Sequence, residues 1–233
     1  MKKFLVAAVA LLGVAAVSNA AVAAPTLSFR VYEDNVLQGA LSTSSTTGTL
    51  AVNGATSLFS VVSAFVVGIP AVNAPGLAAQ STTISSLDNY GTGTHSLRLE
   101  VTQTDVPSLS AGGVFASLAN TLTANLLVNG FGVTSVSISN YADALNRAFE
   151  RATLLATQTF STPGANASPL ITTNLSLPNP LFSETVVIDA IFNAAGAALN
   201  ASSQIVAVPE PASLALFGAG LLGLGLLRRR RNV

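Results

Sequence analysis

Histidine is the side chain best suited to act as a general base near neutral pH, and this chain of 233 residues has one, His95. His95 follows the tetrapeptide Gly-Thr-Gly-Thr at residues 91–94 and begins a segment of alternating apolar and polar residues. No Gly-x-Ser-x-Gly motif accompanies it to supply a nucleophile. We therefore interpret His95 as a surface residue at the edge of a loop.

Pairs of carboxylates can hydrolyse glycosidic bonds, and two pairs lie close in sequence: Glu100 with Asp105, and Glu184 with Asp189. Both pairs have an odd spacing, and residues at an odd spacing on a strand point to opposite faces. Neither pair converges unless a β-bulge intervenes. The sequence thus predicts no catalytic residues and a protein that is not an enzyme.

Metal and cofactor sites find equally little support. Asp34, Asp88 and Asp105 fall in expected loops, where carboxylates can bind calcium, but no Asp-x-Asp-x-Asp-Gly motif is present. The chain has no cysteine, which excludes disulfides and thiolate-bound metals. We expect no metal and no cofactor, and we interpret the acids as groups that keep the surface solvated.

The charge balance argues against a nucleic-acid partner. Between residues 24 and 208, four arginines oppose nine acids, which leaves a net charge of −5, and no lysine follows Lys3. A nucleic-acid backbone requires a basic surface, which this segment lacks. Three Asn-x-Ser sequences, at Asn166, Asn174 and Asn200, are interpreted as chance matches to a glycosylation pattern in an Asn- and Ser-rich region.

The elements expected to position these residues are strands. Ser, Thr, Asn, Gly and Val dominate the segment, and the clearest two-residue alternation runs over residues 95–104. Further strands are predicted at residues 26–32, 36–41, 50–52, 57–67, 114–129, 133–138, 171–177, 183–193 and 204–208, whereas 68–81, with two prolines, is predicted to be irregular. We expect an all-β fold, an antiparallel β-sandwich of the Ig-like or jelly-roll kind.

Residues 140–159 allow two interpretations. Tyr141, Leu145 and Phe149 are spaced for one face of a helix. The threonines that follow disfavour a helix, and the neighbouring segments on both sides are predicted strands. We predict strand, turn and strand, with the helix as the alternative.

Both ends of the chain differ from this segment. Residues 1–23 combine Lys2 and Lys3, an apolar run and the small residues Ala21 and Ala23, which is typical of a secretory signal peptide cleaved after Ala23, or after Ala20 as the alternative. We therefore expect signal peptidase to be a partner. Residues 24–208 would form a single folded domain.

The last residues have three parts in a fixed order. Pro209, Glu210 and Pro211 form a rigid extended segment. Residues 212–227 carry no charge and, at ~1.5 Å per residue, would form a helix of roughly 24 Å, which could span a membrane if the bilayer thins. Four arginines, Arg228, Arg229, Arg230 and Arg231, would then stop transfer on the cytoplasmic side.

This order of Pro-Glu-Pro, apolar span and arginine run resembles the PEP-CTERM sorting signal, here at residues 209–233. The resemblance implies processing near Pro209, Glu210 and Pro211 by exosortase, a membrane enzyme of Gram-negative bacteria that make exopolysaccharide. Residues 24–208 are also similar to a loosely related class of tagged, β-rich exported domains. That similarity rests on residues 27–34, 97–105 and 182–189, and on the segment from Tyr141 to Phe149.

From these patterns we expect an exported protein that is held transiently in the inner membrane and then released to the cell surface or the extracellular space. The resemblance implies a structural or adhesive role in exopolysaccharide biofilm or floc, with exopolysaccharide as a further partner. Two alternatives stay open. One is a secreted enzyme that acts on polysaccharide, and the other is a membrane-anchored periplasmic protein whose tail is never cut.

Overall fold

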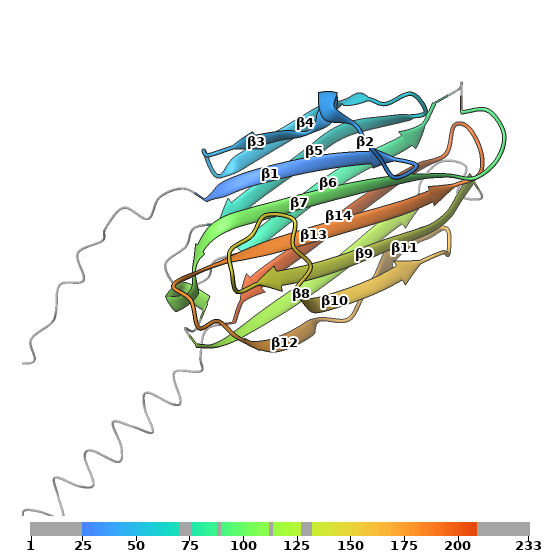
Figure 1. Ribbon diagram of the computed structural model, residues 1–233. Helices are drawn as coiled ribbons and strands as arrows, with labels where there is room; N and C mark the ends of the chain where they lie inside the picture. Colours follow the sequence, from blue (N-terminus) through green and yellow to red (C-terminus); the bar gives the residue numbers. More distant parts are fainter. Residues whose placement is uncertain (1–24, 70–75, 88–89, 112–113, 127–131, 209–233) are drawn as a thin grey trace, which may run out of the picture.

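Two antiparallel sheets make up the part of the chain that the computed structural model describes, residues 25–69, 76–87, 90–111, 114–126 and 132–208 (Figure 1). Sheet A contains, in spatial order, β10 (Thr153–Phe160), β9 (Val133–Asp143), β13 (Leu181–Phe192), β7 (His95–Pro107), β1 (Thr26–Glu33) and β2 (Val36–Leu37), and β3 (Thr43–Ser45) also pairs with β1. Sheet B contains β11 (Gly164–Ala167), β8 (Phe115–Leu126), β14 (Ala198–Ala207), β6 (Gly76–Ser86), β5 (Phe59–Ile69) and β4 (Thr49–Ala55), and β12 (Ile171–Ser176) pairs with β8.

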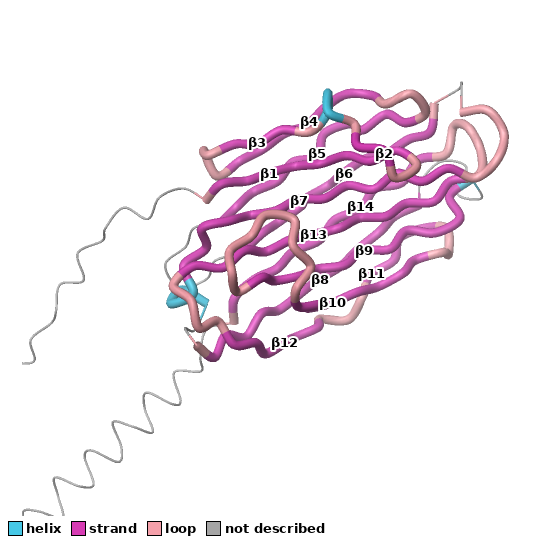
Figure 2. The backbone as a smooth tube through the Cα atoms, viewed as in Figure 1, coloured by secondary structure: helices cyan, strands magenta, loops and turns pink. Residues whose placement is uncertain are grey.

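The sheets stack face to face as two layers, and strands dominate the described backbone (Figure 2). The later part of the chain passes back and forth between them: β7 lies in sheet A, β8 in sheet B, β9 and β10 in A, β11 and β12 in B, β13 in A and β14 in B. The predicted all-β antiparallel sandwich is confirmed. Two short 3-10 turns, η1 (Gly39–Leu41) and η2 (Ser108–Ala111), are the helical elements in the described residues.

Alternating side chains build the core between the sheets. In β1, Leu27, Phe29 and Val31 are buried while the residues between them face outward. Burial of such a side chain stabilises the fold by about 1.5–3 kcal/mol, so two facing sheets of alternating strands can supply a core without disulfides. At one end of the core the rings of Phe59 and Phe192 meet with centroids 5.0 Å apart.

Residues 140–159 form strand, turn and strand, as predicted. β9 ends at Asp143, β10 begins at Thr153, and residues 144–152 form a loop between them, called the 144–152 loop below. Asn146 and Phe149 adopt positive φ angles of 57° and 62° in this loop. A helix cannot accommodate such angles, so the helical spacing of Tyr141, Leu145 and Phe149 reflects a folded loop.

Three local predictions were wrong. Residues 76–81 belong to β6, a strand in the middle of sheet B, although 68–81 was predicted to be irregular. β6 lacks strict alternation, and its pairing with β14 and β5 on both sides holds it in the sheet. The strand predicted at 36–41 stops at Leu37, because the chain turns at η1 and carries Leu41 into the core. β11 is a short strand within residues 161–170, a proline-containing stretch for which the sequence predicts a loop.

The predicted signal peptide, residues 1–23, and the predicted sorting signal, residues 209–233, lie outside the described residues. Within the described ranges, no helix is both long and apolar enough to cross a membrane. The expected membrane helix at 212–227 therefore stays a prediction.

Candidate functional site

His95 contacts the carboxylate of Asp34, a pairing that the sequence does not predict. Its Nδ1 lies 2.7 Å from Oδ2 of Asp34, and Oδ1 of Asp34 accepts a hydrogen bond from the backbone N–H of Ser96. The hydroxyl of Tyr90 accepts a hydrogen bond from the backbone N–H of His95. Burial by itself would raise the pKa of Asp34, but the hydrogen bonds from Ser96 and His95 outweigh it and lower the pKa. The pair fastens the turn after β1 to the start of β7.

The two candidate carboxylate pairs do not form catalytic pairs. Asp189 faces outward and accepts a hydrogen bond from Nε of Arg98 at 2.6 Å, whereas Glu184 lies in the core and is fully buried. A register shift between β13 and β7 falls beside Asp105, but Asp105 binds Asn146 while Glu100 binds the guanidinium of Arg151. Each carboxylate is thus committed to a separate partner.

The expected calcium ligands are equally dispersed. Asp34 lies beside the first residues of β7 and Asp105 near its last, which places them roughly 30 Å apart along the strand. Asp88 lies outside the described residues. Among the residues that the structure describes, no three His, Cys, Asp or Glu side chains are grouped to hold a metal ion.

The 144–152 loop lies across the outer face of sheet A, in front of β13 and β7 in Figure 1. Asn146 exchanges two hydrogen bonds with Asp105, at 2.8 and 2.9 Å. The backbone N–H of Phe149 donates to Oγ1 of Thr102, and the guanidinium carbon of Arg30 lies 3.8 Å from the centre of the Phe149 ring. These contacts hold the loop at several points along its length.

Asp143 organises the start of this loop. Its side chain is 2% exposed and accepts hydrogen bonds from the backbone N–H groups of Leu145 and Arg147 and from the Arg147 guanidinium. Burial acts to raise the pKa of Asp143, but the side-chain and backbone hydrogen bonds from Arg147 and Leu145 together lower it. Asp143 is therefore a structural carboxylate that stays ionised.

Glu184 has no such partner. Neither carboxylate oxygen has a hydrogen-bond partner among the described residues, and the same is true of Oε1 of Gln103, which pairs with Glu184 across β7 and β13. Burial raises the pKa of Glu184 to about 8. A carboxyl that is neutral at pH 7 and enclosed between two sheets cannot reach a substrate at the surface.

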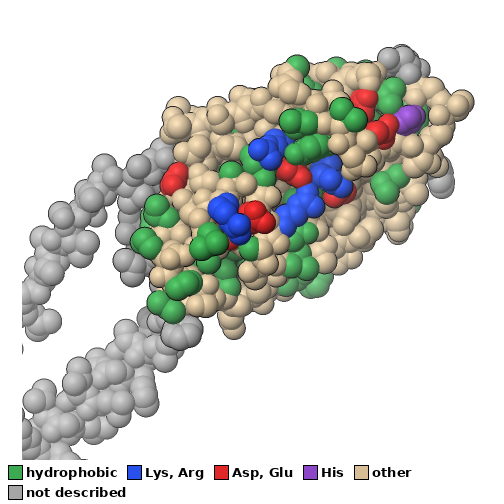
Figure 3. All heavy atoms as spheres, viewed as in Figure 1, with side chains coloured by type: hydrophobic (Ala, Val, Ile, Leu, Met, Phe, Trp, Pro, Cys, Tyr) green, Lys and Arg blue, Asp and Glu red, His purple; other side chains and the backbone are tan. Residues whose placement is uncertain are grey.

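Charge divides the two sheets completely. Every charged residue that the structure describes belongs to sheet A or to a loop or turn next to its strands, and Figure 3 shows the arginines and acids gathered on the outer face of sheet A. The seven strands of sheet B contain no Asp, Glu, Lys or Arg. The described outer face of sheet B is therefore uncharged, and along β8 it presents the hydroxyl and amide groups of Ser117, Thr121, Thr123 and Asn125.

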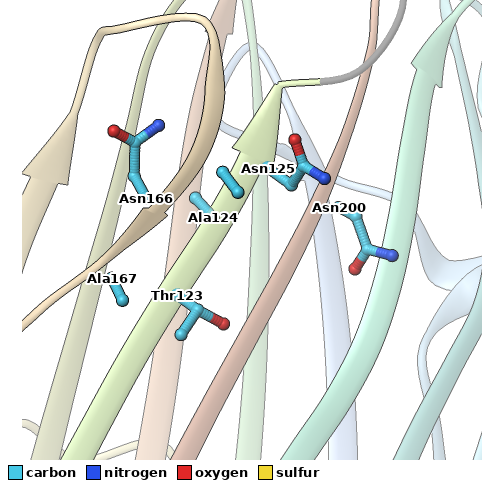
Figure 4. Close-up of a pocket in the computed structure, with 7 residues that line it drawn as sticks. Thr123, Ala124, Asn125, Asn166, Ala167 and Asn200 are labelled. Carbon is cyan, nitrogen blue, oxygen red and sulfur yellow. The ribbon is translucent and has the colours of Figure 1, made fainter.

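Two shallow pockets lie on β8 in sheet B. The first, of about 330 Å³, lies between β8, β11 and β14, and Figure 4 shows Thr123 and Asn125 on β8 with Asn166 and Asn200 on the strands to either side. The second, of about 390 Å³, lies between β8 and β12 and includes Ser117 and Asn174. Both volumes fall at the lower end of the range for small-ligand sites.

The first pocket presents amides held in place by the fold. Asn125 and Asn200 are direct partners across β8 and β14, and Nδ2 of Asn166 donates to the carbonyl oxygens of Thr162 and Gly164 at 2.8 and 2.9 Å. The hydroxyls of Thr123 and Ser202 bond to each other at 2.5 Å. These groups can bind hydroxyl-bearing ligands but provide no base or nucleophile.

These pocket residues are not among the sites that the sequence predicts. Asn166, Asn174 and Asn200 lie in the Asn-x-Ser sequences that are interpreted above as chance matches. The feature that marks the surface, the absence of charge from every strand of sheet B, can be recognised only once the strands are assigned to sheets. The predicted processing residues Pro209, Glu210 and Pro211, the arginines Arg228, Arg229, Arg230 and Arg231, and the cleavage residues Ala21 and Ala23 all lie outside the described residues.

Comparison with protein-family models identifies the tail. Residues 207–231 match the model of the PEP-CTERM protein-sorting motif, which confirms the resemblance drawn from Pro209 to Arg231. The match begins at the final residue of β14, so the motif follows the folded domain directly. A search of curated proteins finds no match.

Solved structures with some likeness to the chain include carbohydrate-binding and adhesin domains. TmCBM61, solved in complex with beta-1,4-galactotriose, has 13% identity and a TM-score of 0.32, over 78% of this chain and 88% of that one. A xylan-binding domain from CBM 22 has 11% identity and a TM-score of 0.30, over 55% and 83%. The K3 cleaved adhesin domain of Lys-gingipain from Porphyromonas gingivalis has 12% identity and a TM-score of 0.28, over 55% and 72%. Scores this low support no argument about what the chain binds.

Proposed function

We propose that this protein, which carries the PEP-CTERM motif, is exported and then processed at the membrane by exosortase. Processing releases the sandwich domain, which serves as a structural or adhesive component of an exopolysaccharide matrix. The observation that carries the proposal is the sorting motif at 207–231, which follows directly after the last strand of the two-sheet domain. In this account the inner membrane holds an intermediate, and the cell surface or extracellular matrix is the destination.

The domain itself supports a role without catalysis. The titratable side chains that the sequence offered as catalytic candidates are bound to separate partners, as with His95 and Asp34, or enclosed in the core, as with Glu184. We propose that the protein is not an enzyme. Purified protein incubated with the host's own matrix should then be retained by it without releasing sugar, whereas steady sugar release would favour a polysaccharide-active enzyme.

The processing step can be tested at the motif. Replacing Pro209, Glu210 and Pro211 with three alanines should leave the full-length protein in the inner membrane, because the segment that exosortase is proposed to recognise is gone. Immunoblots of membrane and medium fractions measure the effect. The matched control is Pro178→Ala with Pro180→Ala, two exposed prolines in the loop before β13, which should leave release unchanged. Normal release of the triple-alanine variant would contradict the proposal.

A further inference from the structure

We propose that the outer surface of sheet B along β8 is a binding site for an uncharged polysaccharide. We call this surface the β8 face and define it by the outward side chains Ser117, Ala119, Thr121, Thr123 and Asn125 with their neighbours on β12 and β14. The inference rests on the proposed matrix function and specifies the class of ligand and the surface that binds it.

The charge distribution selects a neutral partner. An acidic polymer would need cationic side chains to offset its charge, and the four arginines of the described domain all lie on the side of sheet A. The β8 face has neither cations for an anionic polymer nor anions for a cationic one. An uncharged polysaccharide fits this surface, because its hydroxyl groups can be hydrogen-bonded and it brings no charge that would be buried without a counter-charge.

The two pockets lie one after the other along β8. One includes Thr123 and Asn125 near the end of β8, and the other includes Ser117 near its beginning. Six residues separate Ser117 from Thr123, which corresponds to roughly 20 Å along a strand. The pockets are thus arranged along one strand, a spacing that suits an extended chain of several sugars better than a single small molecule.

The hydrogen-bonding groups match a ligand that both donates and accepts. Sugar hydroxyls do both, and an Asn amide offers two donors and a carbonyl acceptor. Asn166 does not belong to the β8 face: it pairs with the buried Ala124, so its side chain lies on the core-facing side of sheet B, opposite to those of Thr123 and Asn125. The amide of Asn125 makes no hydrogen bond within the described part of the chain, so it can give both kinds of contact.

Pre-ordered groups lower the entropy lost on binding. The Thr123 and Ser202 hydroxyls are locked to each other, and the Asn125 and Asn200 backbones are locked by the β8 and β14 ladder. Each contact is nevertheless a neutral hydrogen bond at an open surface. We therefore expect modest affinity for one domain and stronger retention when many domains line one polymer.

The test uses mature protein purified from the cells that make it, run through gels that contain one polysaccharide each. Dextran, laminarin and galactan are the neutral probes, and alginate and polygalacturonate are the acidic ones. The variant Thr121→Arg places a bulky cation on an exposed position in the middle of the β8 face. Its matched control is Thr157→Arg, which changes another exposed threonine, on the outer face of sheet A, where its hydroxyl bonds to that of Ser139.

We expect retardation by at least one neutral probe and by neither acidic probe. Thr121→Arg should weaken that binding at least ~10-fold, Asn125→Ala with Asn174→Ala should weaken it ~5-fold through the loss of two hydrogen-bonding side chains, and Thr157→Arg should leave it unchanged. Melting temperatures matched to the unmodified protein confirm that the variants are folded.

Several outcomes would overturn the inference: no retardation by any neutral probe, a preference for the acidic probes, or equal binding by the two arginine variants. So would a dimer on size-exclusion chromatography that only Thr121→Arg dissociates, because the β8 face would then be a self-association surface. Failure here is distinguishable from failure of the proposed function. If the protein is released and retained by its host matrix but is not retarded by any neutral polysaccharide, the proposed binding site on the β8 face is refuted and the proposed matrix function is not.

Discussion

Sheets A and B share a core and differ in almost everything on their outer faces. Sheet A carries ion pairs, a cation–π contact and the 144–152 loop, whereas sheet B carries hydroxyls, amides and two shallow pockets. The charged side chains of sheet A are mostly occupied with one another. Charged side chains in this domain therefore serve mainly to join segments of the domain itself, and the partner surface that we propose is a neutral one.

The stretches on which the expected resemblance to other tagged domains was based fall on one side of this division. Residues 27–34, 97–105 and 182–189 correspond to β1, β7 and β13, which are neighbours in sheet A, and the segment from Tyr141 to Phe149 ends β9 and enters the loop that covers them. Segments distant in sequence thus form one connected unit. Sheet A is therefore the sheet joined by charged contacts and covered by the 144–152 loop, whereas the binding surface that we propose lies on sheet B.

The largest expected effect concerns Glu184, a carboxyl on β13 that faces the core and has no hydrogen-bond partner among the residues that the structure describes. Its pKa of about 8 in the folded protein lies above its ordinary 4.5, so folding binds a proton between these values and stability falls as pH rises through that window. The loss amounts to ~1.4 kcal/mol per pH unit, or roughly 3 kcal/mol at pH 7. Above pH 8 the loss levels off.

The variant Glu184→Gln should remove this dependence. Urea unfolding at pH 5, 6, 7 and 8 measures it: the unmodified protein should lose stability steadily, and the variant should hold a nearly constant free energy of unfolding over the same range. Parallel curves for the two proteins would show that Glu184 is ionised in the folded state, against our account of the core.

Removing Asp143 comes next in size. Asp143→Ala should destabilise the domain by about 2–3 kcal/mol, because backbone N–H groups of the 144–152 loop lose their acceptor together with Arg147. Asp189→Ala is the matched control: its ion pair with Arg98 is 36% exposed on the acid's side, so its loss should cost ~1 kcal/mol or less. Thermal unfolding of the two variants compares them, and equal losses would contradict the assigned role of Asp143.

The pKa of Asp143 adds a pH dependence of the opposite sign to that of Glu184. Because this pKa is lowered from 3.8, the stability that Asp143 contributes is present above 3.8 and is lost as pH falls through the lowered value. As the pH falls below 3.8, the free energy of unfolding should therefore decrease more for the unmodified protein than for the Asp143→Ala variant. An identical acid limb in both proteins would argue against an ionised, hydrogen-bonded Asp143.

A smaller effect is expected from the stacked pair that holds the far end of the loop. Arg30→Ala removes the cation over the Phe149 ring and should lower stability by ~1 kcal/mol. Arg30→Lys keeps the charge and should retain part of that stability, since a lysine can still approach the ring. If both variants matched the unmodified protein in urea, the contact would be incidental to loop closure.

The smallest stability change is expected on sheet B. Asn125→Ala should alter the free energy of unfolding by no more than ~0.5 kcal/mol, because its amide supports no other described residue. The comparison between the sheets predicts that outward substitutions on sheet B affect binding while those at the loop of sheet A affect stability. A loss of stability in Asn125→Ala as large as in Asp143→Ala would erase that distinction.

Sequence reasoning succeeded where one strand carries its own pattern. The alternation of Leu97, Leu99 and Val101 identified β7, and the odd spacing of Glu184 and Asp189 correctly predicted that these two side chains point to opposite faces of a strand. The prediction for residues 76–81 was wrong because the pairing of β6 with β14 and β5 on its two sides holds it extended. Such pairing with distant strands leaves no pattern in the local sequence.

Site prediction failed for a related reason. Asp34 and His95 are 61 residues apart, and Asn125 meets Asn200 only through the register of β8 and β14. A lone asparagine in a Ser- and Thr-rich segment resembles any surface residue until the pairing of strands is known. What the sequence does contain is the absence of charge from all strands of sheet B, a pattern that becomes visible only when the strands are assigned to sheets.

The fate of the tail tests the whole account most directly. Mass spectrometry of the C-terminus should be done on protein recovered from the medium and from membranes, in cells with and without exosortase. We predict that released protein ends near Pro209, Glu210 and Pro211 and lacks the arginine run, and that without exosortase the full-length chain stays in the membrane. Released protein that still ends in Val233, in either strain, would contradict it.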